Sequence, residues 1–160
     1  MDNYKKFLDI GIFSIQNGKF QDGIENINKS LEIKSDWEIP YFYRGVAYQA
    51  LEKFDDAILD YTKALSFNNK MADAYYNRAY IMLTRKDLEN IDYNKVIADL
   101  EQALNLDNNF IDALYAMAAA KMKVEKYSES LEFLERLLFI QPDSINAKAL
   151  KKLLLTKYIK

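Results

Sequence analysis

The sequence predicts an all-α fold, an α-solenoid of antiparallel helix pairs with about nine helices. The first observation is a repeat with a period of about 34 residues, which brings Gly11 into register with Gly45 and Phe20 into register with Phe54. The second is that apolar residues recur at spacings of three and four, the period of an amphipathic helix. The third is that only four Gly and two Pro occur in 160 residues. A fixed period of this length indicates stacked repeats, because no single repeat buries its apolar face alone.

The first helix pair follows from its apolar spacing and its break. A helix is expected from about Tyr4 to Gln16, with Phe7 and Ile10 on its packing face. It should end at Gly18, because Gly adopts the left-handed conformation that ends helices. Phe20 then begins a second helix, whose inward residues are expected to be Ile24, Ile27 and Leu31.

The second pair begins with a start signal. Ser35 and Glu38 have the Ser-x-x-Glu spacing of a capping box. Pro40 falls in the first turn of this helix, where its missing N–H costs little. A partner helix is expected from Phe54 to Phe67, ended by two consecutive Asn residues.

The remaining helices follow the same register. They are expected at about residues 72–85, 93–106, 111–124 and 127–140. Pro142 ends the array, and an amphipathic capping helix is expected over 144–160. The predicted organisation of residues 1–143 is therefore four units, at about 4–37, 38–71, 72–110 and 111–144.

These residues closely resemble the tetratricopeptide repeat (TPR), a helix-turn-helix unit of about 34 residues. The second unit matches best, with the following residues at consensus places: Tyr41, Gly45, Tyr48, Phe54, Ala57, Tyr61 and Ala64. It departs from the pattern at Arg44, where the family carries Leu, and at Asn69, where the family carries Pro. The resemblance implies a right-handed superhelical α-solenoid whose concave wall is lined by the first helix of each unit and binds the partner.

The third unit carries five extra residues within 86–92. The first interpretation is neutral drift, because loops tolerate insertions at small entropic cost. The second is that the insertion lengthens both helices by about a turn and forms an edge for a partner. Buried Leu88 and Ile91 in the free protein would favour drift.

Composition narrows the function classes. The chain has no Cys and no His, so disulfides, thiolate or imidazole metal sites and an imidazole base are excluded. It has no Gly-rich phosphate loop, and we expect neither enzymatic activity nor a metal or cofactor. A net charge of −2 and the lack of a basic, aromatic stripe predict no nucleic-acid binding. No stretch has the length of a membrane span, and Asp9 interrupts the apolar start, so a cytoplasmic protein is expected.

The resemblance also implies which side chains line the wall. The predicted peptide-binding groove consists of Leu8, Ile12, Phe42, Tyr43, Val46, Tyr76, Asn77, Tyr80, Tyr115 and Met122. Tyr offers a large contact area at small entropic cost, as recognition surfaces need. We therefore expect a non-catalytic protein–protein interaction scaffold that binds a partially apolar peptide or helix, with Asn77 holding ligand backbone groups. The alternative for each aromatic side chain is packing against neighbouring helices, the role expected of Tyr41, Tyr48, Tyr61 and Tyr75.

One TPR subclass grips the C-terminal carboxylate of heat-shock chaperones with Lys, Asn and Arg side chains. The corresponding places in the first three units hold Leu8, Ile12, Tyr43, Asp73 and Asn77. One unit further on, they hold Phe42, Val46, Asn77, Asp112 and Ala116. Only Asn77 fits, so a chaperone-tail adaptor of that type is not expected.

A second hypothesis is a structural self-assembly unit. The capping helix carries Leu150, Leu153, Leu154 and Leu155, a stripe wide enough to pair with its copy and form a homodimer. The favoured interpretation is a cap with its Lys side outward, because terminal repeats need a polar outer face. A light-scattering mass equal to one chain at high concentration would exclude self-assembly.

Overall fold

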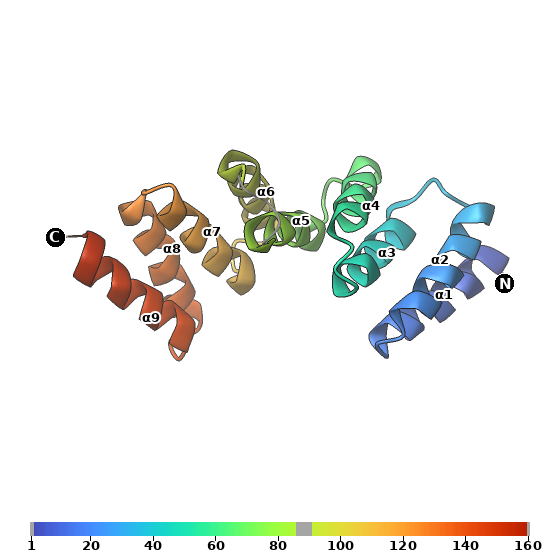
Figure 1. Ribbon diagram of the computed structural model, residues 1–160, viewed down its shortest axis with the longest axis horizontal. Helices are drawn as coiled ribbons and strands as arrows, with labels where there is room; N and C mark the ends of the chain where they lie inside the picture. The colour runs from blue at the N-terminus through green and yellow to red at the C-terminus, as the bar shows by residue number, and fades with distance from the viewer. Residues whose placement is uncertain (1, 86–90, 160) are drawn as a thin grey trace. The chain divides into compact units, whose positions relative to one another are not determined.

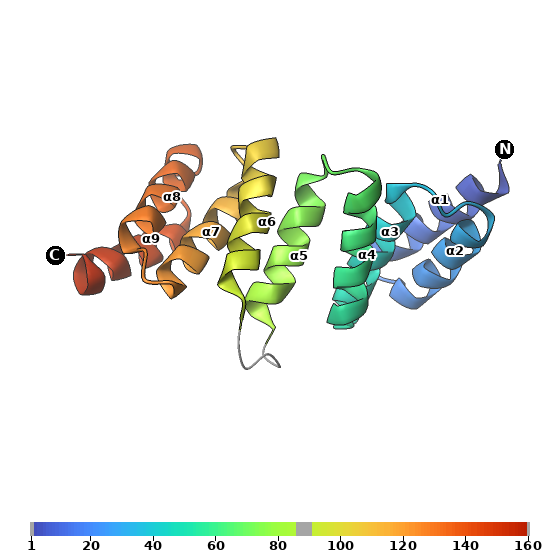
Figure 2. The same cartoon turned by 90° about the horizontal axis from the view of Figure 1, so that it is seen from above.

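The computed structural model describes residues 2–85 and 91–159, and every regular element in these ranges is helical. The helices are α1 (Asn3–Gln16), α2 (Phe20–Ile33), α3 (Glu38–Ala50), α4 (Phe54–Phe67), α5 (Ala72–Thr84), α6 (Tyr93–Leu106), α7 (Ile111–Lys123), α8 (Tyr127–Ile140) and α9 (Ile145–Leu153), followed by a π-helical turn, η1 (Leu154–Tyr158). Figures 1 and 2 show α1 beside α2 and α3 beside α4. The all-α architecture of helix pairs is confirmed. The chain forms two compact units, residues 1–81 and 82–160, which are described separately.

Two glycines let α1 and α2 approach closely in unit 1. A Cβ atom on Gly11 would lie 2.7 Å from Ile27 Cγ1 and 3.0 Å from the backbone oxygen of Gly23. A Cβ atom on Gly23 would overlap with Ile15 Cγ1. Ser30 adds a polar tie across the same pair, because its hydroxyl donates to the backbone oxygen of Tyr4 at 2.8 Å. Small residues at this crossing therefore have the mechanical role that repeat stacking requires.

The core of unit 1 extends from α2 through α3 and α4 to α5. Ile24 and Ile27 of α2 are buried in one cluster with Ala47 of α3. Tyr61 of α4 is fully buried and belongs to a second cluster with Ala74 of α5. Each second helix thus packs on its own first helix and on the first helix of the next pair, which is the stacking expected of repeats.

Unit 2 is built in the same way from α6 to η1. Its fully buried apolar side chains include Leu100, Leu114, Met117 and Leu134. Asp92 caps α6, because its side chain accepts hydrogen bonds from the backbone N–H groups of Asn94 and Lys95. Ile91 is partly buried, whereas Leu88 lies outside the described residues, so the role of the 86–92 insertion stays a prediction.

The start of α3 differs from the expectation. Trp37 is the N-cap residue, and its side chain makes no capping hydrogen bond, so the predicted capping box at Ser35 is wrong. Ser35 instead uses its backbone oxygen, which accepts from the Tyr41 hydroxyl at 3.1 Å. Trp37 packs against the cluster of Leu8 and Ile24, and this apolar anchor sets the start of the helix.

Two further features, one exposed apolar residue and one helix end, differ from the prediction. Ile10 was expected on the packing face of α1, but it is 40% exposed. The last helix was expected to run to residue 160, but α9 ends at Leu153 and a π-helical turn follows. Leu154 is the one fully buried residue of that turn, so tertiary packing fixes the turn at this side chain.

Three residues at the same place in the turn within a helix pair have a left-handed backbone. They are Gly18 (φ 75°), Glu52 (φ 57°) and Glu125 (φ 62°). Glu52 lies one repeat after Gly18, so the turn geometry repeats even where Gly is absent. A side chain in this region costs about 1–2 kcal/mol relative to right-handed backbone.

We expect Glu52→Gly to raise the free energy of unfolding by about 1 kcal/mol, because Gly removes this conformational cost. The larger conformational entropy of Gly in the unfolded chain offsets part of the gain. Glu25→Gly, at an exposed place inside α2, is the matched control and should lower the free energy of unfolding by about the same amount. Urea unfolding followed by the fluorescence of Trp37, the one Trp of the chain, measures both. Equal losses in the two variants would contradict a strained turn.

Candidate functional site

The candidate site of unit 1 is a surface on its first helices. It comprises Ile12 of α1, Phe42, Tyr43 and Val46 of α3, and Tyr76, Asn77 and Tyr80 of α5, and is called the first-helix face below. Tyr80 is 41% exposed, and the other members are partly buried. The face therefore offers accessible aromatic surface mainly on α5.

Leu8 does not contribute to this face. It was predicted to line the groove, but it is only 4% exposed. It lies in the cluster that contains Ile15, Ile24 and Ala47, so helices α2 and α3 cover it. The prediction for Leu8 is wrong because the repeat register gives only the direction of its side chain. The register does not tell how closely the neighbouring helices cover that side chain.

Aromatic contacts hold the remaining members in fixed positions. The Phe42 ring meets the Tyr43 ring edge-on, with centroids 5.4 Å apart, and lies 5.9 Å from the buried Tyr61 ring. The rings of Tyr76 and Tyr80 are 5.8 Å apart and tilted by 35°. Phe42 and Val46 also pack against the core cluster around Tyr61. The α3 part of the face is thus half core, and the α5 part is the more open half.

A polar network lies beneath the face. The Tyr61 hydroxyl donates a hydrogen bond to Gln49 Oε1 at 2.8 Å. Burial raises the pKa of Tyr61, and a hydrogen bond with the Asn77 side chain acts in the opposite direction. Because an Asn amide carries two N–H donors and a carbonyl acceptor, this bond does not use up its capacity. Asn77 is therefore oriented by the core and can still meet a ligand.

Two predicted site residues, Tyr115 and Met122, lie on α7 of unit 2, and both are partly buried. Next to them in sequence, Lys121 has a side chain only 9% exposed and pairs with Glu129 at 2.7 Å. This ion pair and a second one from Lys126 lower the pKa of Glu129. Lys121 and Lys126 are thus paired within the protein itself.

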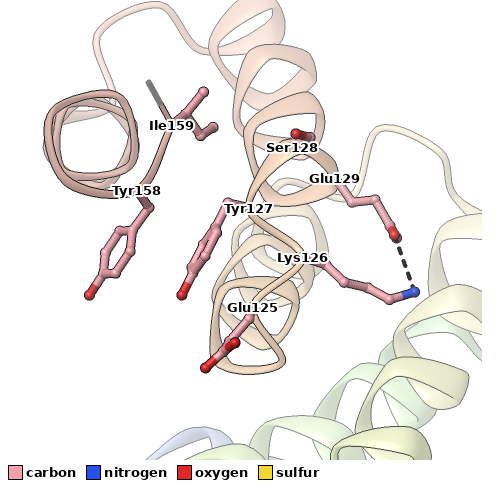
Figure 3. A pocket seen from close by; sticks show the side chains of 7 residues that line it. All are labelled: Glu125, Lys126, Tyr127, Ser128, Glu129, Tyr158 and Ile159. Atoms are coloured by element: carbon pink, nitrogen blue, oxygen red, sulfur yellow. Dashed lines mark ion pairs between the residues drawn. The ribbon is translucent and has the colours of Figure 1, made fainter.

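Unit 2 also has a shallow depression at the start of α8, with a volume of about 380 Å³. Figure 3 shows Tyr127 and Tyr158 side by side there, with centroids 4.5 Å apart and planes inclined by 17°. The Lys126–Glu129 ion pair lies on the other side of α8 in this view. The stacked rings fasten the end of η1 to α8, a contact that sequence reasoning missed because the expected helix had no bend.

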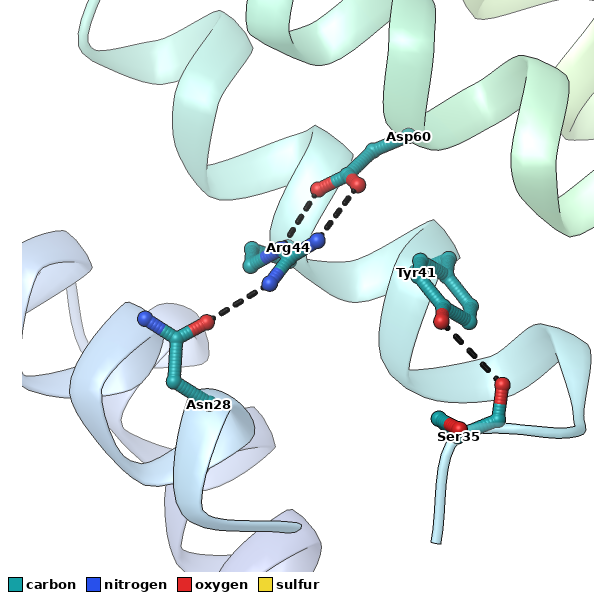
Figure 4. Close-up of polar contacts among 5 residues, drawn as sticks. All are labelled: Asn28, Ser35, Tyr41, Arg44 and Asp60. Carbon is teal, nitrogen blue, oxygen red and sulfur yellow. Dashed lines mark hydrogen bonds and ion pairs between the residues drawn. The ribbon is translucent and has the colours of Figure 1, made fainter. Parts of the chain in front are cut away.

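An unexpected polar cluster joins α2, α3 and α4. Arg44 donates to Asp60 through two bonds, Nε to Oδ2 at 2.7 Å and Nη2 to Oδ1 at 2.8 Å. Its Nη1 donates to Asn28 Oδ1 at 2.7 Å, and Tyr41 lies alongside (Figure 4). The hydrogen bond with Asp60 raises the pKa of Arg44. Arg44 is therefore a structural crosslink, although it borders a shallow depression of about 480 Å³.

Two features are absent from the described part of the chain. Within residues 2–85 and 91–159, no group of three or more His, Cys, Asp or Glu side chains is placed to hold a metal ion. No helix of the same ranges combines the length and apolar character needed to cross a membrane.

The comparison with known families decides the identity of the repeat. Two models of the tetratricopeptide repeat match residues 39–70 and 87–154, and together they cover more than half of the chain. The chain is a tetratricopeptide repeat protein. Human sperm-associated antigen 1 is 31% identical to it over 97 residues, which is 61% of this chain and 10% of that protein. The chain spans between 10% and 19% of the length of the curated relatives it matches.

Solved structures confirm the TPR-like solenoid fold. MamA superposes with a TM-score of 0.81 at 20% identity, over 96% of this chain and 86% of MamA. The first TPR domain of Spaghetti, solved with an HSP90 peptide, has a TM-score of 0.65 at 23% identity, over 72% of this chain and 87% of that domain. The TPR fold is typical of protein–protein interaction scaffolds, which are generally non-catalytic.

Proposed function

We propose that this TPR protein binds a peptide or helix segment of a protein partner through the first-helix face, without catalysis. The observation that carries the proposal is the exposed Tyr80, held beside Tyr76 on the open half of the face. An exposed aromatic ring fixed by its neighbours loses little entropy on binding, which makes it an effective anchor. Asn77 supports the proposal, because an amide oriented by Tyr61 is suited to hold ligand backbone groups.

The charge of the face indicates the character of the ligand. Asp9 and Asp73 are exposed on α1 and α5, the helices that carry Ile12 and Tyr80. Lys5 of α1 is also exposed, but it pairs with Asp2 at 3.5 Å. The Spaghetti domain has the same fold and binds the acidic peptide SRMEEVD. In the present chain the clamp places of the chaperone-binding subclass hold apolar and acidic residues apart from Asn77. We therefore propose a partly apolar ligand that carries positive charge, in place of an acidic tail.

The test uses binders selected from a random peptide library on the whole chain. We expect Tyr80→Ala to weaken the selected peptides at least about tenfold, because one anchor residue contributes this much. Leu59→Ala is the matched control, since Leu59 is 67% exposed on α4, a second helix. Fluorescence anisotropy with labelled peptides gives the affinities. Peptides that bind both variants with unchanged affinity would contradict a site on the first-helix face.

The alternative is self-assembly through the C-terminal helix. Ala147 and Leu154 are fully buried, so one side of α9 and η1 is already covered. Leu153 and Leu155 remain half-exposed, with exposed Lys152 beside them. This remaining stripe is narrow and flanked by charge, and we infer that α9 acts mainly as a cap. A light-scattering mass of two chains that Leu155→Lys reduces to one would favour the alternative.

A further inference from the structure

A second apolar surface lies on α1, away from the first-helix face. Ile10 and Phe13 are one helical turn apart and are 40% and 68% exposed. We call these two residues the α1 outer row. Neighbouring exposed apolar side chains of this kind are typical of interaction surfaces.

The repeat register shows what covers the same places elsewhere. In α3 the equivalent residues are Arg44 and Ala47, and α2 covers both. Arg44 bonds to Asn28 of α2, and Ala47 is fully buried with Ile24 and Ile27. In α7 the equivalent residues are Met117 and Ala120, both fully buried, and α7 packs against α6. Within each unit, a preceding second helix therefore occupies this face.

The covering helices share one pattern. In α2 the apolar residues are Ile24, Ile27 and Leu31, and in α6 they are Ile97, Leu100 and Leu104. Both sets have spacings of three and four, which place them on one side of a helix. The occupant of the α1 outer row should carry the same pattern, because it would meet the same face.

The exposed charge of Lys6 on α1 sets one more requirement for a helix that docks on the α1 outer row. Lys6 is exposed at the place where α3 and α5 carry the buried residues Pro40 and Ala74. A helix that lies on α1 as α2 lies on α3 runs antiparallel to it, so its C-terminal turn comes next to Lys6. A carboxylate in that turn would complement the Lys6 ammonium group, as Glu32 in the last turn of α2 would do.

We propose that the α1 outer row docks an amphipathic helix from a protein partner. This helix lies antiparallel to α1, carries apolar residues with the α2 spacing and has a carboxylate in its last turn. The surface is separate from the first-helix face, so the chain would hold two protein segments at once.

The probe is a peptide with the sequence of residues 20–33, stapled between positions 21 and 25, which are exposed in α2. The staple is needed because isolated helices of this length are marginal in water. We expect the probe to bind the whole chain and Phe13→Asp to weaken binding at least about tenfold. Phe139→Asp is the matched control, since Phe139 is 89% exposed on α8, and it should leave the affinity unchanged. A probe with Glu at positions 27 and 31 should not bind.

Four results would overturn the proposal. The first is no binding to the wild-type chain, and the second is equal binding to wild type and Phe13→Asp. The third is a loss caused by Tyr80→Ala and not by Phe13→Asp, which would assign the probe to the first-helix face. The fourth is a light-scattering mass of two chains that Phe13→Asp reduces to one, which would make a second copy the occupant. An unchanged melting temperature of Phe13→Asp shows that the variant is folded.

Discussion

Replacing Tyr61 by Ala is expected to lower the free energy of unfolding by about 4 kcal/mol, the usual cost of removing a fully buried aromatic ring. The Tyr61 ring fills the space that Gly45 leaves open, since a Cβ atom there would lie 3.0 Å from Tyr61 Cε1. It also packs beside Phe42. Its removal would leave a cavity where α3, α4 and α5 meet, and Trp37 fluorescence during urea unfolding measures the loss.

Tyr61→Phe separates packing from hydrogen bonding. It keeps the ring but leaves Gln49 and Asn77 without the hydroxyl between them. This variant should lose only about 1–2 kcal/mol. Tyr158→Ala, at a position that is 38% exposed, should lose less than Tyr61→Ala. If Tyr61→Ala cost no more than Tyr158→Ala, the core assigned to unit 1 would be wrong.

Replacing Asp60 by Ala should cost about 3 kcal/mol, because it leaves the Arg44 guanidinium without a counterion in a largely buried place. The two side chains are 8% and 20% exposed, and the bidentate geometry makes the pair strong. Arg44→Leu in the Asp60→Ala background should recover most of this loss, since an apolar side chain needs no counterion. The family carries Leu at this place, which supports the expected fit.

The control for this pair is the exposed Lys151–Glu135 contact at 3.0 Å. Glu135→Ala should change stability by less than about 1 kcal/mol, because surface ion pairs are screened by water. A double-mutant cycle on Arg44 and Asp60, measured by urea unfolding, gives their coupling energy. A double variant no more stable than Asp60→Ala alone would show that Arg44 does not depend on its charge partner.

The helices themselves were predictable from the sequence. The bounds expected for Phe54–Phe67 and Tyr93–Leu106 agree with α4 and α6. Apolar periodicity sets the length of such a helix, and polar turns set its ends, so both signals are local. The grouping of the helices into four repeat units and a cap rests on the sequence register and stays a prediction.

The start of α3 and the depth of the wall residues were not predictable in the same way. Ser35 has the spacing of a capping box, but the packing of Trp37 on the core decides where the helix begins. Leu8 points toward the wall by register, yet α2 and α3 bury it. Contacts with neighbouring helices override the local signals at both places. The sequence of one repeat, taken alone, does not show those contacts.

The Arg44–Asp60 pair was missed, although the sequence contains a signal for it. Arg44 stands where the family has an apolar residue, which indicates a buried charge in need of a partner. The pattern also recurs one repeat later, where Arg78 Nη1 donates to Thr62 Oγ1 at 2.9 Å. Thr62 lies one repeat after Asn28, so the register predicts the polar contact of Arg78 once that of Arg44 is known.

The most direct test of binding through the first-helix face is a ¹⁵N NMR titration of the chain with a library-selected peptide. The proposal predicts that the largest amide shift changes fall on α3 and α5, around Tyr43, Asn77 and Tyr80. Shift changes confined to α2 and α4, or to α9 and η1, would contradict it.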